Sequence, residues 1–354
     1  MNHLKQIAAK LAEYHIDAML VNSEPGEFYA VGLHGEGMAV VTPNAARYIT
    51  DSRYIEVARE SVNGTDVVMV DHARNYAALV NEFLDANGVK KLGIEDGYMS
   101  LAQYNSLKAS LHAELIPANG LVVGLRASKD GEEFSRMVEA QRITDRAFTE
   151  ILNFIKPGIT ESEIAAKLTY DMLRFGAQRM SFDPIVASGP NGSRPHAIPG
   201  PRQVQNGEFI TMDFGCVYQG YCSDMTRTVA LGEINDDKRK VYETVLAAQQ
   251  AGIAASRAGV PGTVIHGAAA QVIQDAGYGP YFGHGYGHSV GIEIHESPNA
   301  NTRDTTPMPV GAMVSAEPGI YLPGQFGVRI EDVVRMDECG CTDITRSPKE
   351  LIIL

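Results

Sequence analysis

Four carboxylates in the second half of the chain stand at matching places in two similar segments. Asp213 and Glu317 each end a segment that begins with glycine, GEFITMD in the first and GAMVSAE in the second. A further acid follows each segment, Asp224 after the first and Glu331 after the second. Acids that converge in one cleft repel each other and resist desolvation, and divalent cations are the usual partners that offset this. We therefore predict a metal site; the alternative for each acid alone is a surface position or an arginine partner.

The alternation of side chains along a strand supports this arrangement. Asp213 shares a strand face with apolar Phe209, where a solvated carboxylate is not normally placed. Asp224 follows Asp213 across a Tyr-Gln-Gly turn, which suits neighbouring strands of a hairpin. Glu331 shares a face with Arg329 in the corresponding place of the second segment. The acids are therefore expected to project from paired strands into a common space.

Histidines supply the nitrogen ligand that such a site needs. A glycine-rich segment carries His284, His288 and His295, and its glycines allow the backbone to approach a site closely. His288 is the expected ligand, with His284 and His295 on either side of it. His196 lies in a loop rich in glycine and proline before the first acidic strand, where we expect the rim of a cleft. A single histidine is more often a core residue, but three histidines within twelve positions favour a functional site.

A carboxylate-rich site with one imidazole suits two cations such as Mn²⁺, Co²⁺ or Zn²⁺ with a hydroxide between them. Such a pair lowers the pKa of water and polarises a carbonyl, which is the chemistry of amide or ester hydrolysis. The sequence has no His-Glu-x-x-His helix motif and no Gly-x-Ser-x-Gly motif. A zincin site and a serine nucleophile are therefore not indicated.

The helices that precede these strands also repeat. Gly158 follows the end of one expected helix, and Gly259 follows the end of another about 100 residues later. Gly176 and Gly277 end the next helices at the same spacing. A period of this length is too long for a solenoid repeat. We expect two similar half-domains packed face to face, with a cleft between them.

The first part of the chain has a different pattern, in which short apolar runs alternate with helical stretches. It predicts an α/β domain without the glycine motif of a dinucleotide site. A helix is expected near the start, within residues 1–15, and a boundary near residues 125–130. After the boundary, Asp130 and Glu133 form the capping pattern of a helix that runs to about Phe154. The further elements expected in the first domain are strands at residues 17–22, 38–42, 66–70 and 91–95, and helices at 53–61, 75–86 and 100–109.

Length and composition agree with two ordinary globular domains. The chain has 354 residues, of which 44% are hydrophobic, and a net charge of −13. The acidic balance argues against nucleic acid or an anionic membrane surface as a partner. Four cysteines are too few for a disulfide framework, and we expect reduced thiols. No apolar run is long enough for a membrane span and no targeting signal is recognised, so the expected location is the cytoplasm.

Taken together, these motifs resemble those of metallopeptidases with the pita-bread fold, in the Xaa-Pro peptidase group of prolidase and aminopeptidase P. The resemblance covers the whole chain. It implies a creatinase/prolidase-type α/β domain at residues 1–125 and an α+β pita-bread catalytic domain with a pseudo-twofold duplication at residues 126–354. The segments that carry it are MDFG at residues 212–215, SDMTRT at 223–228, HGYGH at 284–288, AEPGIY at 316–321 and VRIED at 328–332.

The resemblance also implies a role for each site residue. Asp213 would bind one metal ion, and Asp224 and Glu331 would bridge both. His288 and Glu317 would complete the second site, and Glu317 would also take the proton of the bridging water. The remaining residues match positions around the substrate: His196 and His295 to hold it and stabilise the tetrahedral intermediate, Arg329 to orient the ligand carboxylates, and His284 near the pocket.

One position departs from the family pattern. Ser289 follows the ligand His288, where the family usually has glycine. We expect this small side chain to change the pocket wall at most and to leave metal binding intact. The retained ligands argue against the metal-independent creatinase branch. The extra N-terminal domain argues against a plain methionine aminopeptidase.

The function expected from this resemblance is that of a dinuclear metal-dependent exopeptidase. It would cleave the bond between an N-terminal residue and proline in peptides with proline at the second position. Dipeptidase and longer-peptide aminopeptidase activity are both open, as is an aminopeptidase of other specificity. The alternative from another class is a catalytically silent peptide-binding module of the same fold. The resemblance further implies a homodimer.

Overall fold

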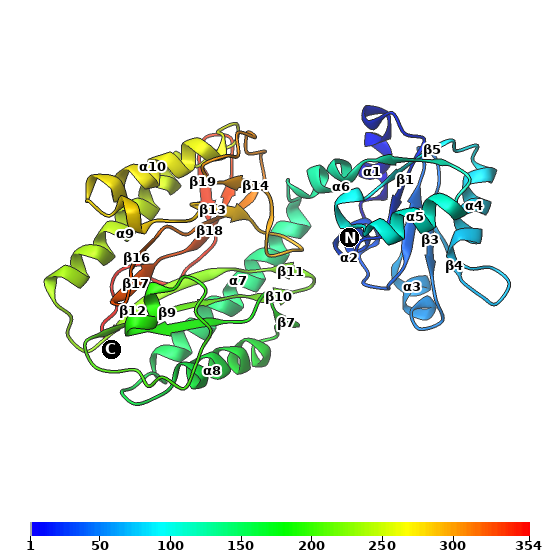
Figure 1. Cartoon of the computed structure of the whole chain (residues 1–354). Helices are drawn as coiled ribbons and strands as arrows, with labels where there is room; N and C mark the ends of the chain where they lie inside the picture. Colours follow the sequence, from blue (N-terminus) through cyan, green and yellow to red (C-terminus); the bar gives the residue numbers. More distant parts are fainter. Residues whose placement is uncertain (1) are drawn as a thin grey trace. The chain divides into compact units, whose positions relative to one another are not determined.

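The computed structural model describes residues 2–354 (Figure 1). The chain divides after Arg126 into two units, the second spanning Ala127–Leu354. None of the helices within residues 2–354 has the length and apolar character that a membrane span needs. All four cysteines are free thiols.

A six-stranded mixed sheet of order β4-β3-β2-β1-β5-β6 forms the centre of the first unit. Its strands are β1 (Ala18–Val21), β2 (Met38–Val41), β3 (Ala46–Thr50), β4 (Asp66–Met69), β5 (Lys91–Ile94) and β6 (Glu114–Pro117). Its helices are α1 (Leu4–Lys10), α2 (Glu24–Val31), α3 (Ile55–Ser61), α4 (Tyr76–Ala86), α5 (Leu101–Ser110) and α6 (Asn119–Arg126), with 3-10 turns η1 (Leu11–Tyr14) and η2 (Asp96–Tyr98). Apolar residues of α4 and of the sheet share one buried core, which includes Leu79 and Phe83 of the helix and Leu20 and Val40 of the strands.

The predicted elements of this unit are present, and others join them. The four predicted strands are β1, β2, β4 and β5, and the three predicted helices are α3, α4 and α5. The predicted N-terminal helix is shorter than expected, because α1 gives way to a 3-10 turn that ends at His15 in a left-handed conformation. Helix α2 was not predicted because Pro25 and Gly26 occur in it. Both lie in its first turn, where proline is tolerated and Ser23 caps the helix through Gly26 N.

Two halves of similar construction make up the second unit. The first half has helices α7 (Gly131–Leu152) and α8 (Glu161–Arg174) with strands β7 (Arg179–Met180), β8 (Ile185–Ser188), β9 (Glu208–Phe214), β10 (Cys216–Tyr218), β11 (Tyr221–Cys222) and β12 (Met225–Leu231), and the 3-10 turn η3 (Gly189–Ser193). The second half has helices α9 (Asp236–Ala255) and α10 (Gly262–Asp275), the 3-10 turn η4 (Gly279–Tyr281), and strands β13 (Gly287–Ser289), β14 (Glu296–Ala300), β15 (Met313–Ala316), β16 (Gly319–Leu322), β17 (Phe326–Arg329), β18 (Asp332–Met336) and β19 (Cys341–Asp343). The strands lie between the two helix pairs (Figure 1).

Equivalent helix ends show the repeat in the backbone. Gly158 and Gly259 follow the first helix of each half, and Gly176 and Gly277 follow the second. All four have positive φ angles, between 80° and 109°, which favour glycine. The first helix also begins as predicted, because Asp130 and Glu133 form a capping box at the start of α7.

Strand β9 lies between two apolar cores and thereby sets the direction of Asp213. Ile210 and Met212 belong to the core beneath α7 and α8, whereas Phe209 belongs to the core beneath α9 and α10. Because side chains alternate along a strand, Asp213 lies on the same side as Phe209. The predicted strand face is therefore observed, and the acid projects toward the second half.

Candidate metal centre and active site

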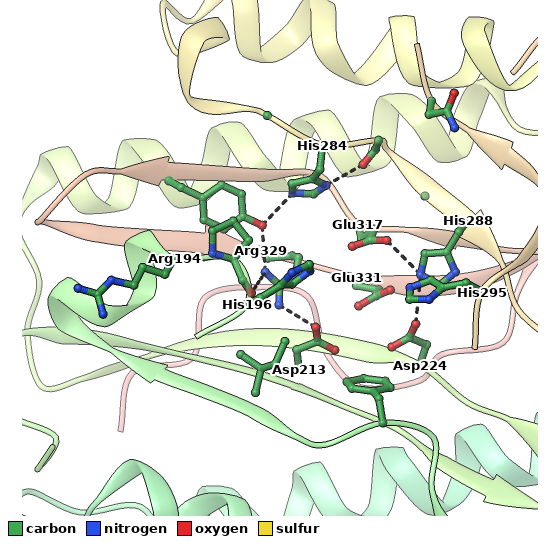
Figure 2. Close-up of a pocket in the computed structure, with 18 of the residues that line it drawn as sticks. Arg194, His196, Asp213, Asp224, His284, His288, His295, Glu317, Arg329 and Glu331 are labelled. Atoms are coloured by element: carbon green, nitrogen blue, oxygen red, sulfur yellow. Dashed lines mark hydrogen bonds and ion pairs between the residues drawn. The ribbon is translucent and has the colours of Figure 1, made fainter. Parts of the chain in front are cut away.

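One pocket in the second unit, of about 1090 Å³, gathers the residues singled out from the sequence (Figure 2). Figure 2 shows the four acids around a common space, with His288 and His295 at one side of it. The predicted site residues that line the pocket are Asp213, Asp224, His288, Glu317, Glu331, His196, His284, His295 and Arg329. The fold therefore brings together every residue that the sequence predicted for the site.

Each half of the unit contributes two of the acids. Asp213 lies on β9, and Asp224 directly precedes β12, which pairs antiparallel with β9. Glu317 directly follows β15, and Glu331 lies between β17 and β18. Asp213 is opposite Thr226 in the β9–β12 register. The predicted hairpin relation between the first two acids is thus present.

A close approach of two strands places His288. A Cβ atom on Gly287 would lie 1.8 Å from the carbonyl oxygen of Ser315, so only glycine allows β13 to come this near to β15. His288 Nε2 consequently lies 3.3 Å from Glu317 Oε1 and 3.5 Å from Asp224 Oδ2. The glycines around this histidine therefore do position the backbone, as the sequence predicted.

The protonation of His288 leaves its lone pair facing these carboxylates. Its Nδ1 lies 3.1 Å from the carbonyl oxygen of Ser289, which can only accept, so the proton of a neutral ring is on Nδ1. Burial lowers the pKa of His288, which favours the neutral ring. When Asp224 and Glu317 are ionised, Nε2 and their oxygens are all acceptors turned toward each other. A cation between them would convert this repulsion into ligation.

The carboxyl groups themselves are held in an unfavourable environment for anions. Burial raises the pKa of Asp224 well above its ordinary value, and the charges of Asp213 and Glu317 raise it further. Burial and the Asp224 charge do the same to the pKa of Glu331. Burial raises the pKa of Glu317 to about 7, although Arg329 opposes the shift. The cluster therefore lacks enough positive charge from the protein alone.

One oxygen on each of two acids is fixed, while the other is left without a partner. Arg329 Nη2 donates to Asp213 Oδ2 over 2.7 Å, and Thr226 Oγ1 donates to Glu331 Oε2 over 2.7 Å. Asp213 Oδ1 and Glu331 Oε1 are buried and have no hydrogen-bond partner among the described residues. Ligand atoms of Asp224, His288 and Glu331 lie within 4.8 Å of one another. Oriented, unsatisfied oxygens beside a neutral imidazole fit a divalent metal site.

The neighbouring Asp332 shows what a fully satisfied buried acid looks like in this fold. Its oxygens are bound by Arg227, Lys349 and Gln249. Burial acts to raise its pKa, but Arg227 and Lys349 hold the pKa of Asp332 below its ordinary value. The two consecutive acids therefore have different partners. Asp332 is paired with positively charged side chains, whereas Glu331 has no such ion pair among the described residues.

Two side chains of the site were not assigned a role from the sequence. Tyr321 OH accepts from Arg329 Nη1 over 2.9 Å and lies 2.9 Å from His284 Nε2. Thr226 Oγ1 accepts from Arg329 Nε over 3.0 Å while it donates to Glu331. Both belong to the motif segments that carry the resemblance. A tyrosine or a threonine does not by itself indicate a site role in the sequence. Only the hydrogen bonds from Arg329 show that these two hydroxyls belong to the site.

The remaining histidines occupy different parts of the pocket. Burial lowers the pKa of His284 to about 4, and Arg329 adds to the shift, so the ring is neutral. The ring of His295 lies edge to face with that of His288 at a centroid distance of 4.4 Å. His196 is exposed in the loop after η3, in keeping with the rim position predicted for it.

Ser289 does not contribute to the pocket wall. It is fully buried, and its hydroxyl donates to the carbonyl oxygen of Pro298 over 2.5 Å. The pocket is lined by His288 but not by Ser289. The change to the pocket wall that the sequence allowed at this position is not seen, because the Ser289 side chain is turned toward β14.

Comparison with known proteins gives matches over both units. The Creatinase/Prolidase N-terminal domain matches residues 3–128, and the Metallopeptidase family M24 matches residues 135–338. The uncharacterized peptidase YqhT of Bacillus subtilis is 40% identical over 99% of each chain. The structure of an Xaa-Pro dipeptidase from Bacillus anthracis superposes with a TM-score of 0.95 at 39% identity, covering 99% of each chain. That of an X-Pro aminopeptidase from Thermotoga maritima gives 0.91 at 33% identity, covering 97% of this chain and 99% of the other.

These matches confirm the family and the fold that the sequence motifs predicted. The similar structures cover both units at high TM-scores, including that of the prolidase from Pyrococcus horikoshii at 0.90. The repeated halves and their acidic strands are accordingly those of the pita-bread fold. The chain belongs to metallopeptidase family M24, with a creatinase/prolidase N-terminal domain ahead of its pita-bread catalytic domain.

Proposed function

We propose that the protein is an exopeptidase that uses two divalent cations to hydrolyse the bond between an N-terminal residue and proline. The observation that carries the proposal is that His288 Nε2 faces the oxygens of Asp224 and Glu317 in a buried place, and all three groups are acceptors once the acids are ionised. The similarity to an Xaa-Pro dipeptidase and an X-Pro aminopeptidase supports the choice of substrate.

The proposed ligands divide between two ions. Asp213, Asp224 and Glu331 would hold the first ion, and Asp224, Glu331, His288 and Glu317 would hold the second. Five protein ligands with only one nitrogen suit Mn²⁺, Co²⁺ or Zn²⁺. Two such ions, when bound, lower the pKa of a water molecule and polarise the carbonyl that it attacks.

Glu317 is the proposed general base. Ser315 Oγ donates to Glu317 Oε1 over 3.1 Å and so holds the carboxyl group in one orientation. The carboxylate of Glu317 therefore receives the proton of the attacking water and returns it to the leaving amine.

The histidines without a metal position handle the substrate. His295 stands against the proposed ligand His288, where it can donate to charge developing on the carbonyl oxygen. His196, exposed at the pocket, holds the peptide from the other side. His284 is fixed by Tyr321 and Gly285 as part of the pocket wall near the proline. A tertiary amide resists attack, which makes both polarisation and exact positioning useful.

The test is turnover of purified protein after chelation and reloading with Mn²⁺, Co²⁺ or Zn²⁺. We expect hydrolysis of Xaa-Pro substrates and little hydrolysis of matched Xaa-Ala peptides. Asp224→Asn, which keeps the shape of the side chain, should lose metal and turnover together. Absence of turnover with every metal in folded protein would overturn the proposal.

The same assay distinguishes the two substrate classes that the relatives represent. Rates on Xaa-Pro dipeptides that far exceed those on Xaa-Pro-Yaa would assign a dipeptidase, and the reverse would assign an aminopeptidase. The family resemblance also leads us to propose a homodimer. Light scattering of the eluted protein measures that assembly directly.

A further inference from the structure

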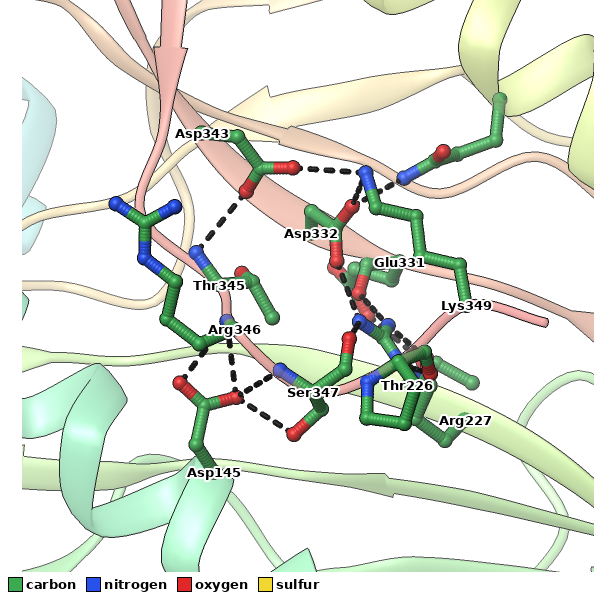
Figure 3. Close-up of polar contacts among 12 residues, drawn as sticks. Asp145, Thr226, Arg227, Glu331, Asp332, Asp343, Thr345, Arg346, Ser347 and Lys349 are labelled. Carbon is green, nitrogen blue, oxygen red and sulfur yellow. Dashed lines mark hydrogen bonds and ion pairs between the residues drawn. The ribbon is translucent and has the colours of Figure 1, made fainter. Parts of the chain in front are cut away.

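A buried arginine lies directly behind the proposed metal ligand Glu331 (Figure 3). The side chain of Arg227 is 1% exposed, and each of its five N–H donors has an acceptor. Nη1 donates to the carbonyl oxygens of Thr226 and Glu331, over 2.9 and 2.5 Å. Nη2 donates to Asp332 Oδ1 and to the carbonyl oxygen of Ser347, each over 2.7 Å. Nε donates to the carbonyl oxygen of Pro348 over 2.9 Å.

These contacts attach Glu331 to strand β12 from both its main chain and its side chain. The main-chain nitrogen of Glu331 donates to the carbonyl oxygen of Thr226 over 3.0 Å. The carbonyl oxygen of Glu331 accepts from Arg227, and its Oε2 accepts from Thr226 Oγ1. Only Oε1 is left free. The direction of that oxygen therefore depends on how residues 226 and 227 hold the glutamate.

Residues 345–349 contact Arg227 and Asp332 on the side away from Glu331. Asp332 Oδ2 is bound by Gln249 Nε2 and by Lys349 Nζ, and Lys349 also reaches Asp343 over 2.7 Å. Asp145 on α7 accepts from the main-chain nitrogen and the hydroxyl of Ser347, over 2.9 and 2.6 Å. Figure 3 shows Asp332 between Arg227 and Lys349, with Asp145 at the other end of the segment.

Stability alone is a weak reason for such an arrangement. Replacing a buried ion pair by apolar side chains of similar volume is often neutral or stabilising, because desolvation offsets much of the attraction. A planar guanidinium whose five N–H groups all donate nevertheless holds five acceptors in one geometry. The ammonium of a lysine has only three donors and cannot do this. The contacts themselves point to orientation, since two of those acceptors are the carbonyl oxygens of Glu331 and Thr226.

We propose that Arg227 is a positioning residue for Glu331, and that Asp332, Lys349 and residues 345–349 hold Arg227 in place. The inference rests on the proposed metal site. It predicts that metal affinity depends on charged side chains that do not line the pocket. Partners of ligand side chains typically contribute about 10- to 100-fold in metal affinity, which sets the expected size of the effect.

The experiment measures the dissociation constant of Mn²⁺ by calorimetry on metal-free protein, with thermal unfolding of the same samples. Arg227→Lys should weaken binding of Mn²⁺ by about 10- to 100-fold. Lys349→Met acts one contact further away and should weaken binding of Mn²⁺ less than Arg227→Lys does, by about threefold to tenfold. Lys349→Arg keeps the charge and should bind Mn²⁺ as the unaltered protein does.

Lys167→Met is the matched control. Lys167 is 28% exposed and pairs with fully buried Asp171 on helix α8, just as Lys349 is 24% exposed and pairs with fully buried Asp332. Both substitutions should lower the unfolding temperature of the metal-free protein, but only Lys349→Met should change Mn²⁺ affinity. An equal loss of affinity in Lys167→Met would overturn the inference, because the effect would then be one of general stability.

The remaining outcomes separate this inference from the proposed function. If the unaltered protein binds no Mn²⁺, both fail. If it binds Mn²⁺ and the folded Arg227→Lys and Lys349→Met proteins bind equally well, only the positioning role fails. If Arg227→Lys does not fold, the comparison of Lys349→Met with Lys349→Arg decides. A change in Arg227→Lys without one in Lys349→Met would overturn the part assigned to Lys349.

Discussion

Arg329 Nη2 donates a 2.7 Å hydrogen bond to Asp213 Oδ2, and both side chains are largely buried. The same guanidinium reaches Tyr321 OH and Thr226 Oγ1. One arginine therefore orients Asp213 directly and Glu331 through Thr226, leaving one free oxygen on each acid. The two acids come from different halves of the unit, so this side chain joins the halves at the site.

Replacing Arg329 by lysine is expected to impair metal binding and turnover together. An ammonium cannot reach Asp213, Thr226 and Tyr321 in the directions that the planar fork does. We expect about a 10- to 100-fold loss in metal affinity and a comparable fall in kcat/KM at limiting metal. Metal analysis and kinetics across a Mn²⁺ titration measure both.

Arg335→Lys serves as the control for that substitution. Arg335 pairs with Asp337, both side chains are about one-third exposed, and neither residue lines the pocket. It should leave metal affinity unchanged. Full metal affinity in Arg329→Lys would contradict the orienting role.

Metal binding is expected to depend on pH because the empty site holds protons. Burial raises the pKa of Glu317 to about 7 and the pKa values of Asp224 and Glu331 well above their ordinary range. Below pH 7 an incoming cation must displace protons, so apparent affinity falls as pH falls, about tenfold per pH unit for each proton displaced. His288 adds less to this dependence than an ordinary histidine would, because burial lowers its pKa.

Calorimetry in two buffers of different ionisation enthalpy counts the protons released. Glu317→Gln should reduce the number released and flatten the pH dependence of Mn²⁺ affinity. An affinity that stays constant from about pH 6 to about pH 7.5, with no proton release, would contradict this account.

The site could be predicted from the sequence to the level of its residues because its acids lie on strands with a simple period. Asp213 has the face expected from Phe209, and the duplicated segment places Glu317 in a matching position. Tyr321 and Thr226 could not be assigned in this way. Their roles depend on the reach of Arg329 across the two halves, which no local pattern encodes.

In the first unit, two strands could not be predicted from the sequence. Strand β3 was not predicted because Ala46–Thr50 contains arginine and lacks a continuous apolar run, yet Tyr48 and Ile49 are fully buried by neighbouring strands. Strand β6 ends in Pro117, which has no N–H to donate to a neighbouring strand. A strand with this proline fits at the edge of the sheet, where β6 lies. Both strands are decided by pairing partners distant in sequence rather than by their own composition.

Removing His295 is expected to reduce turnover without removing metal. Its ring contacts His288 edge to face at 4.4 Å, but it is not among the proposed ligands. His295→Ala should lower kcat by about 100-fold or more, since it takes away a donor to the developing charge. The metal content after dialysis should match that of the unaltered protein, whereas His288→Ala should lose metal. Metal loss in His295→Ala would place this histidine among the ligands instead.

Ser289→Gly should affect stability more than activity. The substitution removes the hydrogen bond from Ser289 Oγ to the Pro298 carbonyl oxygen and adds backbone freedom to strand β13. The hydrogen bond contributes roughly 0.5–1.5 kcal/mol and the backbone freedom roughly 0.5–1 kcal/mol, so the loss is about 1–2.5 kcal/mol. In a unit of this size, the unfolding temperature should fall by about 2–10 °C.

Activity separates this structural role from a role in the pocket. Because Ser289 does not line the pocket, kcat/KM on Xaa-Pro substrates and Mn²⁺ affinity should each stay within about twofold, as expected for a change confined to strand packing. Ser315→Gly is the contrasting variant, since Ser315 Oγ donates to Glu317 and accepts from the main-chain nitrogen of His288. It should lower turnover as well as stability. A change of substrate preference in Ser289→Gly would show that the serine acts on the pocket after all.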